Sequence, residues 1–363
     1  MKRTIIFWNV QRLFGSSGSP IEYALSENEE AATKNHEAVQ GKIDTIAATI
    51  NLIAEHAGPP LFVGFAEIES NDLCRAIATR VASNRLESID HLGKDRTGVA
   101  LDGLNIGALV DCDLVKSVPA LTSHVIDRTF ITRDVLECHL DLGRLGMLAV
   151  LVNHWPSRLS SEGASRRVSS AHYVNRLVFA QTRYGLQEMW DADRKILDLP
   201  NAYEMKQRAH SPVIVMGDFN DEPFNPSIEL LGSTYDSDAV RDDLNVKGRT
   251  KKERFRSYAA SQPRLLNPWW QFVGRAGSYY RSPRWRLYDQ ILLGSGLLQN
   301  TSPIRAVSDS QAILNAEVVV RSDGSVWPLV NRGGKPIPFD LEQARGCSDH
   351  FPIYFQVETQ TDG

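Results

Sequence analysis

In the first 80 residues, short apolar runs alternate with segments whose apolar positions recur at helical spacing. Residues 4–10 form an apolar run rich in β-branched and aromatic residues, which favours a buried strand. The next apolar positions recur at spacings of four and three, on one helical face: Val39, Ile43, Ile46, Ile50 and Ile53. The Gly58-Pro59-Pro60 sequence ends this helix, and residues 61–66 form a second apolar run. With a further helix through about Ala82, the pattern predicts a β-α-β-α opening.

Beyond that opening, short apolar runs dominate. They lie at residues 98–101, 106–110, 135–140, 148–153, 213–216, 288–293, 316–320 and 353–357. Many strands with few intervening helices, and no recognisable linker or repeat, predict one layered α/β sandwich over residues 1–363. Residues 160–210 have charged and apolar positions at helical spacing, which indicates an inserted helical segment. Residues 241–286 are rich in Arg, Lys and aromatic residues and resemble a functional loop region.

Composition and charge narrow the possible functions. The 363 residues carry 40 Lys and Arg against 44 Asp and Glu, a net charge of −4, so any phosphate binding must be local. Four scattered cysteines form neither a disulfide framework nor a Cys/His zinc motif. The apolar start is too short for a signal peptide, and no run reaches the roughly 20 apolar residues of a membrane span. We therefore expect a soluble, cytoplasmic protein.

Polar residues able to do chemistry stand at the ends of predicted strands. Asn9 and Glu67 each follow an apolar run, and His154 closes another; a turn or loop role is the simpler interpretation of each alone. The Gly-Asp-Phe-Asn sequence after residues 213–216 is more specific, because alternation puts Asp218 and Asn220 on one face of an extended chain.

The C-terminal part adds two more carboxylates and a histidine. Asp289 begins a predicted strand, and the Asp349-His350 pair stands just before the last one. Amides, carboxylates and two histidines at strand ends together supply the parts for metal-assisted phosphoryl chemistry. Hydrolysis of a phosphodiester needs an in-line water, neutralisation of charge on the phosphate and stabilisation of the leaving oxygen.

These segments, in this order, resemble the endonuclease/exonuclease/phosphatase superfamily, and most of all its bacterial nuclease-like members. The segments are Phe7-Trp8-Asn9-Val10, Phe65-Ala66-Glu67-Ile68, Asn153-His154-Trp155-Pro156-Ser157, Gly217-Asp218-Phe219-Asn220, Tyr288-Asp289-Gln290-Ile291 and Ser348-Asp349-His350. The resemblance implies a four-layer α/β sandwich in which two packed mixed sheets are flanked by helices.

The resemblance also implies roles for individual residues. Glu67 would be the principal ligand of Mg²⁺ or Mn²⁺, helped by Asn9 and, directly or through water, by Asp349. His350, oriented by Asp289, would either deprotonate the attacking water or hydrogen-bond the scissile phosphate.

Three further positions complete the implied site. Asp218 would align or activate the water, and Asn220 would donate to a phosphate oxygen. His154 would contact the phosphate or assist the leaving oxygen. Arg158, just after that strand, is a candidate phosphate contact because guanidinium matches phosphate oxygens bidentately.

The expected activity is Mg²⁺-dependent cleavage of nucleic acid, with DNA as the expected substrate and endonucleolytic action. Two alternatives remain open. The same residues could hydrolyse a small or lipid phosphate ester, such as an inositol phosphate or a sphingomyelin-like molecule, or the chain could be a catalytically silent binding protein. The aromatic residues of 241–286 could stack bases, or they could pack the loop onto the sandwich. No protein partner can be inferred.

Overall fold

The computed structural model describes residues 1–15, 29–91, 103–126, 134–159, 162–191, 196–242, 244 and 246–360. The strand expected at 98–101 lies outside these residues. Two seven-stranded mixed sheets form the centre of the molecule. The first contains, in spatial order, β16 (Ile304–Ala306), β20 (Ile353–Thr359), β1 (Lys2–Leu13), β2 (Pro60–Ile68), β4 (Asn105–Asp111) and β3 (Leu86–Ser88), with β17 (Ala312–Ile313) also paired to β20.

The second sheet has a similar mixed arrangement. Its order is β11 (Ser233–Thr234), β12 (Leu265–Leu266), β15 (Asp289–Gly294), β10 (Val213–Asp218), β7 (Met147–His154), β6 (Val135–Asp141) and β5 (Ser117–His124). Within the described residues, the strands predicted from apolar runs are thus confirmed. The strand predicted at 316–320 is the shorter β18 (Val318–Val320), which pairs with β19 (Val326–Pro328) in a hairpin outside the two large sheets. Strand β5 was not predicted because none of its residues is buried; among the described strands it pairs with β6 and lies at the sheet edge.

Side-chain alternation builds the layers. Along β1, Ile5 and Phe7 face the core between the two sheets, whereas Ile6 and Trp8 face the outer core beneath a helix. The second sheet repeats this pattern, with Ile214 turned inward and Val215 turned outward. Because central strands such as β1, β2, β7, β10 and β15 bury both faces, continuous apolar runs rather than alternating ones marked them in the sequence.

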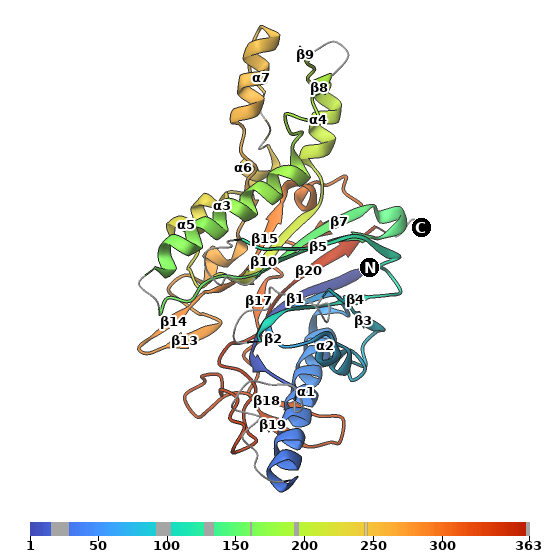
Figure 1. Cartoon of the computed structure of the whole chain (residues 1–363). Helices are drawn as coiled ribbons and strands as arrows, with labels where there is room; N and C mark the ends of the chain where they lie inside the picture. Colours follow the sequence, from blue (N-terminus) through green and yellow to red (C-terminus); the bar gives the residue numbers. More distant parts are fainter. Residues whose placement is uncertain are drawn as a thin grey trace.

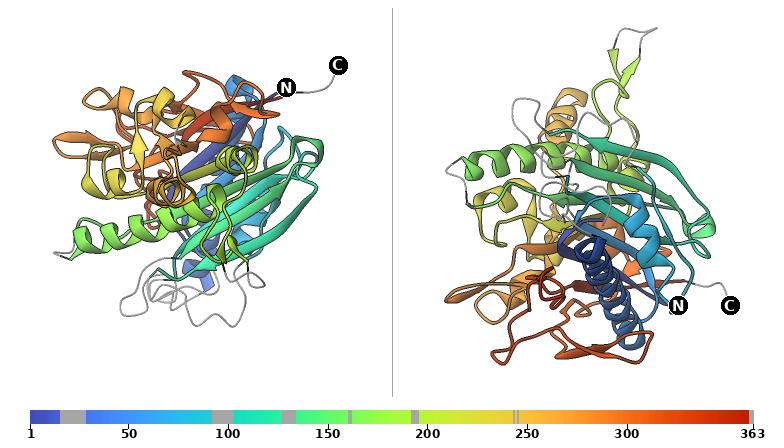
Figure 2. Two further views of the ribbon diagram at one scale, coloured as in Figure 1. Left: turned by 90° about the horizontal axis from the view of Figure 1, so that it is seen from above. Right: turned by 60° about the horizontal axis from the view of Figure 1, so that its bottom comes forward.

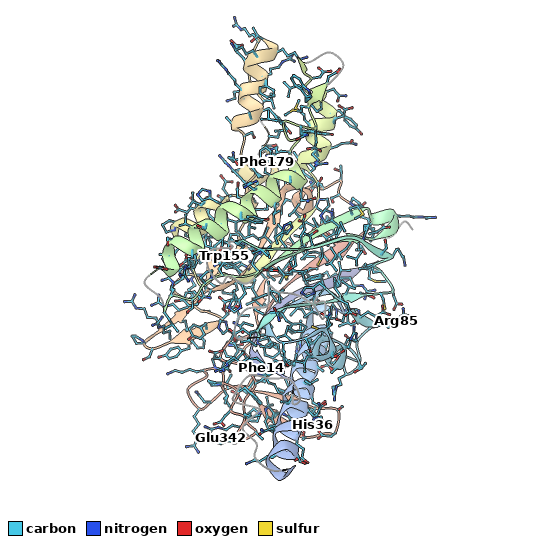
Figure 3. The ribbon with its side chains drawn as sticks, viewed as in Figure 1. Phe14, His36, Arg85, Trp155, Phe179 and Glu342 are labelled. Atoms are coloured by element: carbon cyan, nitrogen blue, oxygen red, sulfur yellow. The ribbon has the colours of Figure 1, made fainter. Side chains whose placement is uncertain are left out.

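Helices cover both outer faces, which confirms the predicted α/β sandwich. Helices α1 (Glu29–Ala57) and α2 (Asn71–Ala78) pack on the first sheet, and α3 (Gly163–Thr182) and α5 (Pro226–Leu230) on the second. Figure 1 shows the four layers from α3 at the top to α1 at the bottom, and the right view of Figure 2 brings α1 forward. Trp155 lies beneath α3 (Figure 3). None of the described helices combines the length and apolar composition needed to cross a bilayer.

Parts of the two segments singled out in the sequence, 160–210 and 241–286, leave the sandwich. Four elements project together above the sandwich (Figure 1). They are the short strands β8 (Trp190–Asp191) and β9 (Ile196–Leu197) and the helices α4 (Ala202–Ala209) and α7 (Lys251–Ala260). Met189, Met205 and Tyr258 form a small apolar cluster within this projection. Residues 241–286 are therefore not one loop: besides α7 they contain η2 (Pro268–Phe272) and the hairpin of β13 (Tyr279–Arg281) and β14 (Arg284–Arg286).

The cysteines are expected to be nearly inert in the folded protein. Burial raises the pKa of Cys74 and of Cys347 to about 12 and raises that of Cys138 as well, while Cys112 is half-buried. Since only the thiolate is nucleophilic, at most one thiol should react with Ellman's reagent in the native protein and four after denaturation. Rapid reaction of three thiols under native conditions would contradict these environments.

Candidate active site

Strand directions bring six strand ends to one place. Strands β1 and β2 run parallel, as do β7 and β10, so their carboxyl ends share an edge with the starts of the antiparallel strands β20 and β15. Asp218, at the end of β10, is the meeting point of the two sheets. Its Oδ2 accepts a hydrogen bond of 3.0 Å from Asn9 Nδ2 and lies 3.7 Å from His154 Nε2 and 3.9 Å from His350 Nε2.

His350 and Asp289 form a buried hydrogen-bonded pair. The His350 Nδ1 lies 2.7 Å from Asp289 Oδ2, which also accepts a 2.5 Å bond from the Ser278 hydroxyl. Asp289 is fully buried and the His350 side chain is 6% exposed. With Nδ1 held by this carboxylate, the imidazole presents Nε2 to Asp218. The two residues that were expected to act as a pair are therefore in contact, and Tyr279 stacks on the His350 ring at 4.6 Å between centroids.

Burial and mutual charge shift the ionisation of this cluster. The pKa of Asp218 rises to about 7, first because burial penalises its charged form and then because Asp289 is negative. The pKa of His350 rises to about 10: burial opposes its charge, but Asp289, Asp349 and Asp218 together outweigh burial. Burial also raises the pKa of Asp349. At neutral pH the site thus holds a protonated imidazole beside carboxylates that are difficult to ionise.

Glu67 lies at a β-bulge near the end of β2 rather than in the loop after it. The pairing of β2 with β4 shifts register between Ala66 and Ile68, and Glu67 has a φ of 64°. A non-glycine residue in this conformation costs about 1–3 kcal/mol and needs support from its surroundings. The Arg12 amide donates to Glu67 Oε2 at 3.0 Å, and Asn9 Nδ2 donates to Oε1 at 3.2 Å. The bulge therefore aims a half-buried carboxylate into the site.

Asn9 acts in the structure as a donor. Its Nδ2 bonds to Glu67 and Asp218, while its Oδ1 accepts a 2.9 Å bond from the Gln11 amide. Coordination of a cation through Oδ1 would require the side-chain amide to turn and release Gln11. The role expected for Asn9 as a ligand stays a prediction, and the contact that the structure describes is the alignment of two carboxylates.

Two supporting residues were not anticipated. Lys42 of α1 is 1% exposed, donates to the Gln11 carbonyl at 2.5 Å, and has a pKa lowered by burial to about 8, which Glu67 and Asp349 partly offset. Its only signal in the sequence is a charge beside the apolar face that holds Val39 and Ile43. Ser348 donates to the Asn9 carbonyl at 2.6 Å and so ties the Ser-Asp-His segment to β1.

The donor set suits a hard divalent cation. Glu67 and Asp349 could supply oxygen ligands beside Asp218. Burial, with a smaller contribution from neighbouring carboxylates, raises the pKa of Asp349 and of Asp218, and a bound cation would favour their charged forms. Asp218, Asp289 and His350 also place ligand atoms within 4.8 Å of one another. Asp289, however, is inaccessible and already binds His350 and Ser278, so this trio fits acid–base chemistry better than metal binding.

The loop after β10 places Asn220 and Arg158. Asn220 has a φ of 51°, donates through its backbone amide to Asp218 Oδ1 at 2.9 Å, and donates through Nδ2 to the Trp155 carbonyl at 3.0 Å. Arg158 Nε donates to the Asn220 carbonyl at 2.7 Å, and its Nη2 pairs with Asp221. Arg158 thus holds the loop, and only its Nη1 takes part in no hydrogen bond recorded among the described residues. Phosphate contacts by either residue stay predictions.

Gly217 is required by close approach of β10 to β7. A Cβ built on it would overlap the Asn153 carbonyl oxygen and lie 2.7 Å from Asn153 Cβ. Backbone cannot yield as a flexible side chain can, so Gly217→Ala should cost about 1–3 kcal/mol or more of stability, seen as a lower thermal midpoint or failure to fold. Gly185→Ala is the matched control, since its Cβ would meet only Glu188 Oε2 at 3.5 Å. Equal midpoints for both variants would contradict the close approach.

Comparisons with known proteins agree with this geometry. A sequence model described as the endonuclease/exonuclease/phosphatase family matches residues 4–185 and 194–359. A humanized D. rerio TDP2 is similar in structure at 16% identity and a TM-score of 0.50, with 99% of each chain covered. An endonuclease/exonuclease/phosphatase family protein from Bacteroides thetaiotaomicron is similar at 12% identity and a TM-score of 0.50, again with 99% of each chain covered. TDP2 from C. elegans is similar at 11% identity and a TM-score of 0.50, with 99% of this chain and 76% of that chain covered.

No curated protein sequence matches the chain significantly. At these identities the structural likeness shows a shared fold and nothing finer. The sequence match, in contrast, extends over nearly the whole chain and includes every strand end that contributes to the site.

Proposed function

The chain belongs to the endonuclease/exonuclease/phosphatase family of metal-dependent phosphoric ester hydrolases, and on that premise we propose that it is a Mg²⁺-dependent phosphodiesterase that cleaves DNA endonucleolytically. The observation that carries the proposal is the convergence on Asp218 Oδ2 of Asn9, His154 and His350, contributed by strand ends of both sheets. Glu67, Asp289 and Asp349 complete the cluster.

The chain's own residues divide the work of an in-line displacement. Asp218 lies where it can orient the attacking water and accept its proton, with Asn9 and the Asn220 amide holding its two oxygens. His350, kept protonated by Asp289, donates from Nε2 to a non-bridging phosphate oxygen. His154 approaches from the other sheet, 3.7 Å from both Glu67 and Asp218, and donates to the phosphate or to the departing oxygen.

The metal role falls to Glu67 and Asp349, with Asn9 as the third expected ligand. A bound Mg²⁺ would supply positive charge against the developing negative charge on the phosphate. The buried Lys42 interacts electrostatically with Glu67 and Asp349 and supplies a countercharge from within the protein. Lys42 thus offsets part of the repulsion between the clustered carboxylates.

Nucleic acid is favoured as substrate because exposed cations stand near the site in a chain of net charge −4. The hairpin of β13 and β14 carries exposed arginines and begins at the residue that stacks on His350. Local positive charge of this kind suits a polyanion better than a small ester.

The test is a substrate panel run with Mg²⁺ and with EDTA. It contains supercoiled plasmid, single-stranded oligonucleotide, abasic duplex, inositol phosphates and sphingomyelin, each also incubated with His350→Ala. Plasmid nicking that needs the metal and is lost in His350→Ala is expected. Turnover of only the small or lipid esters would replace the nuclease proposal with a phosphatase. Inactivity on every member with Mg²⁺ bound would leave a silent binding protein.

A further inference from the structure

The hairpin of β13 and β14 is joined to the catalytic histidine at its base. Tyr279, its first residue, forms an antiparallel bridge with His350 and stacks on the imidazole at 4.6 Å and 29°. Tyr288, beyond the hairpin, also stacks on Tyr279, at 5.7 Å between ring centroids. In Figure 1 the hairpin projects at the left of the sandwich. Its base is therefore fixed relative to the reacting phosphate.

The two faces of the hairpin carry different side chains. Tyr279 pairs with Arg286 and Arg281 with Arg284, and alternation places all four on one face. Tyr280 and Trp285 share the other face, where Trp285 stacks on Phe351 at 5.7 Å. Since Tyr279 faces His350, the arginines of its face extend on the same side as the catalytic site.

Arg281 and Arg284 form an uncompensated pair of like charges. They lie directly opposite each other next to the two-residue turn, and both are exposed. Arg286, two pairs closer to the base, is neutralised by Glu222 at 2.7 Å, but no carboxylate pairs with the outer two among the residues that the structure describes. Like charges directly opposite on neighbouring strands are destabilising. Free rotation of these exposed side chains weakens the repulsion between the two guanidinium groups, but no negative charge among the described residues offsets it.

We propose that Arg281 and Arg284 form a clamp for phosphates of the nucleic-acid strand a few nucleotides from the scissile bond. At about 3.4 Å per residue, Arg281 lies roughly 7 Å along the hairpin from Tyr279. This distance corresponds to about two nucleotides at the 3.4 Å rise of one strand in a duplex. Two guanidinium groups side by side match successive phosphate oxygens, and a polyanion removes the repulsion between them. This inference rests on the proposed nuclease function.

The test compares Arg281→Gln/Arg284→Gln with the wild type in two assays. One is binding of a fluorescein-labelled 12-nucleotide single strand in EDTA, followed by anisotropy at several salt concentrations. The other is the ratio of kcat/KM for that oligonucleotide to kcat/KM for bis(p-nitrophenyl) phosphate, which has no flanking phosphate. We expect the affinity for the oligonucleotide and the kcat/KM ratio each to fall about 10- to 100-fold. The slope of log affinity against log salt concentration should become shallower by about 1.4, or 0.7 per lost phosphate contact.

The matched control is Arg144→Gln/Lys116→Gln, which removes the same charge from the opposite end of the second sheet, where β7 begins. It should bind and cleave like the wild type. If the hairpin variant does so too, while the wild type cleaves the oligonucleotide, the clamp is refuted and the nuclease function stands. If the wild type turns over only the small ester, or binds anionic phosphatidylserine vesicles instead of the oligonucleotide, both proposals fall. The thermal midpoint of the hairpin variant should not decrease, since a repulsive pair is removed.

Discussion

Replacing His350 by alanine is expected to lower kcat by about 10²- to 10⁴-fold. On our proposal the imidazole donates to the phosphate. Its Nδ1 is held 2.7 Å from Asp289, and although burial opposes its charge, Asp289, Asp349 and Asp218 raise its pKa to about 10. Alanine leaves the Asp289 charge buried and without its cationic partner. Initial rates on plasmid and on bis(p-nitrophenyl) phosphate measure the effect, and both substrates should lose activity alike.

Asp289→Asn tests whether the two residues act as a unit. An amide cannot hold the protonated imidazole, so the single variant should lose activity of the same order as His350→Ala. The double variant should then be little worse than either single one, because residues of one unit are not additive. His172→Ala, at an exposed position of α3, is the control. Multiplicative losses in the double variant would show that His350 and Asp289 act separately.

The fold could be predicted from the sequence because its central strands are buried on both faces. The apolar run at residues 213–216 and the helical spacing from Val39 to Ile53 can be recognised in the sequence alone. Prediction failed where burial was lacking: β5 has no buried residue, and the strand predicted at 316–320 is present as β18 but pairs with β19 outside the two large sheets. Edge elements of this kind are specified by pairing and turns, which leave little trace in hydrophobic pattern.

The site was predictable as a set of strand ends but not in its details. Asp218 and His350 were singled out because they stand at the ends of apolar runs, and their expected roles came from the resemblance of their segments to a known family. The orientation of the Asn9 amide and the bulge at Glu67 depend on backbone conformations near Gln11 and Ile68 that no local residue type demands. The stacking of Tyr279 on His350 joins residues 71 positions apart in sequence, which neither spacing nor periodicity encodes.

Asp218→Asn is expected to abolish most activity and yet to stabilise the metal-free protein. An amide cannot accept a proton from water, so kcat should fall by about 10²- to 10⁴-fold. The stability effect follows from the pKa of Asp218, which burial and Asp289 raise from 3.8 to about 7. A carboxyl with a raised pKa in the folded state makes the protein less stable as pH rises from about 4 to 7, since the unfolded chain ionises first.

Asparagine removes this cost while it keeps an oxygen to accept from Asn9. In EDTA at pH 8 the thermal midpoint of Asp218→Asn should exceed that of the wild type by roughly 2–6 °C, and the difference should shrink towards pH 4. Asp242→Asn, which neutralises an exposed carboxylate at the end of α6 (Ser237–Arg241), is the control and should leave the midpoint unchanged. A midpoint for Asp218→Asn at or below the wild type at pH 8 would show that burial of this carboxylate carries no cost. Activity within tenfold of the wild type would remove Asp218 from the reaction.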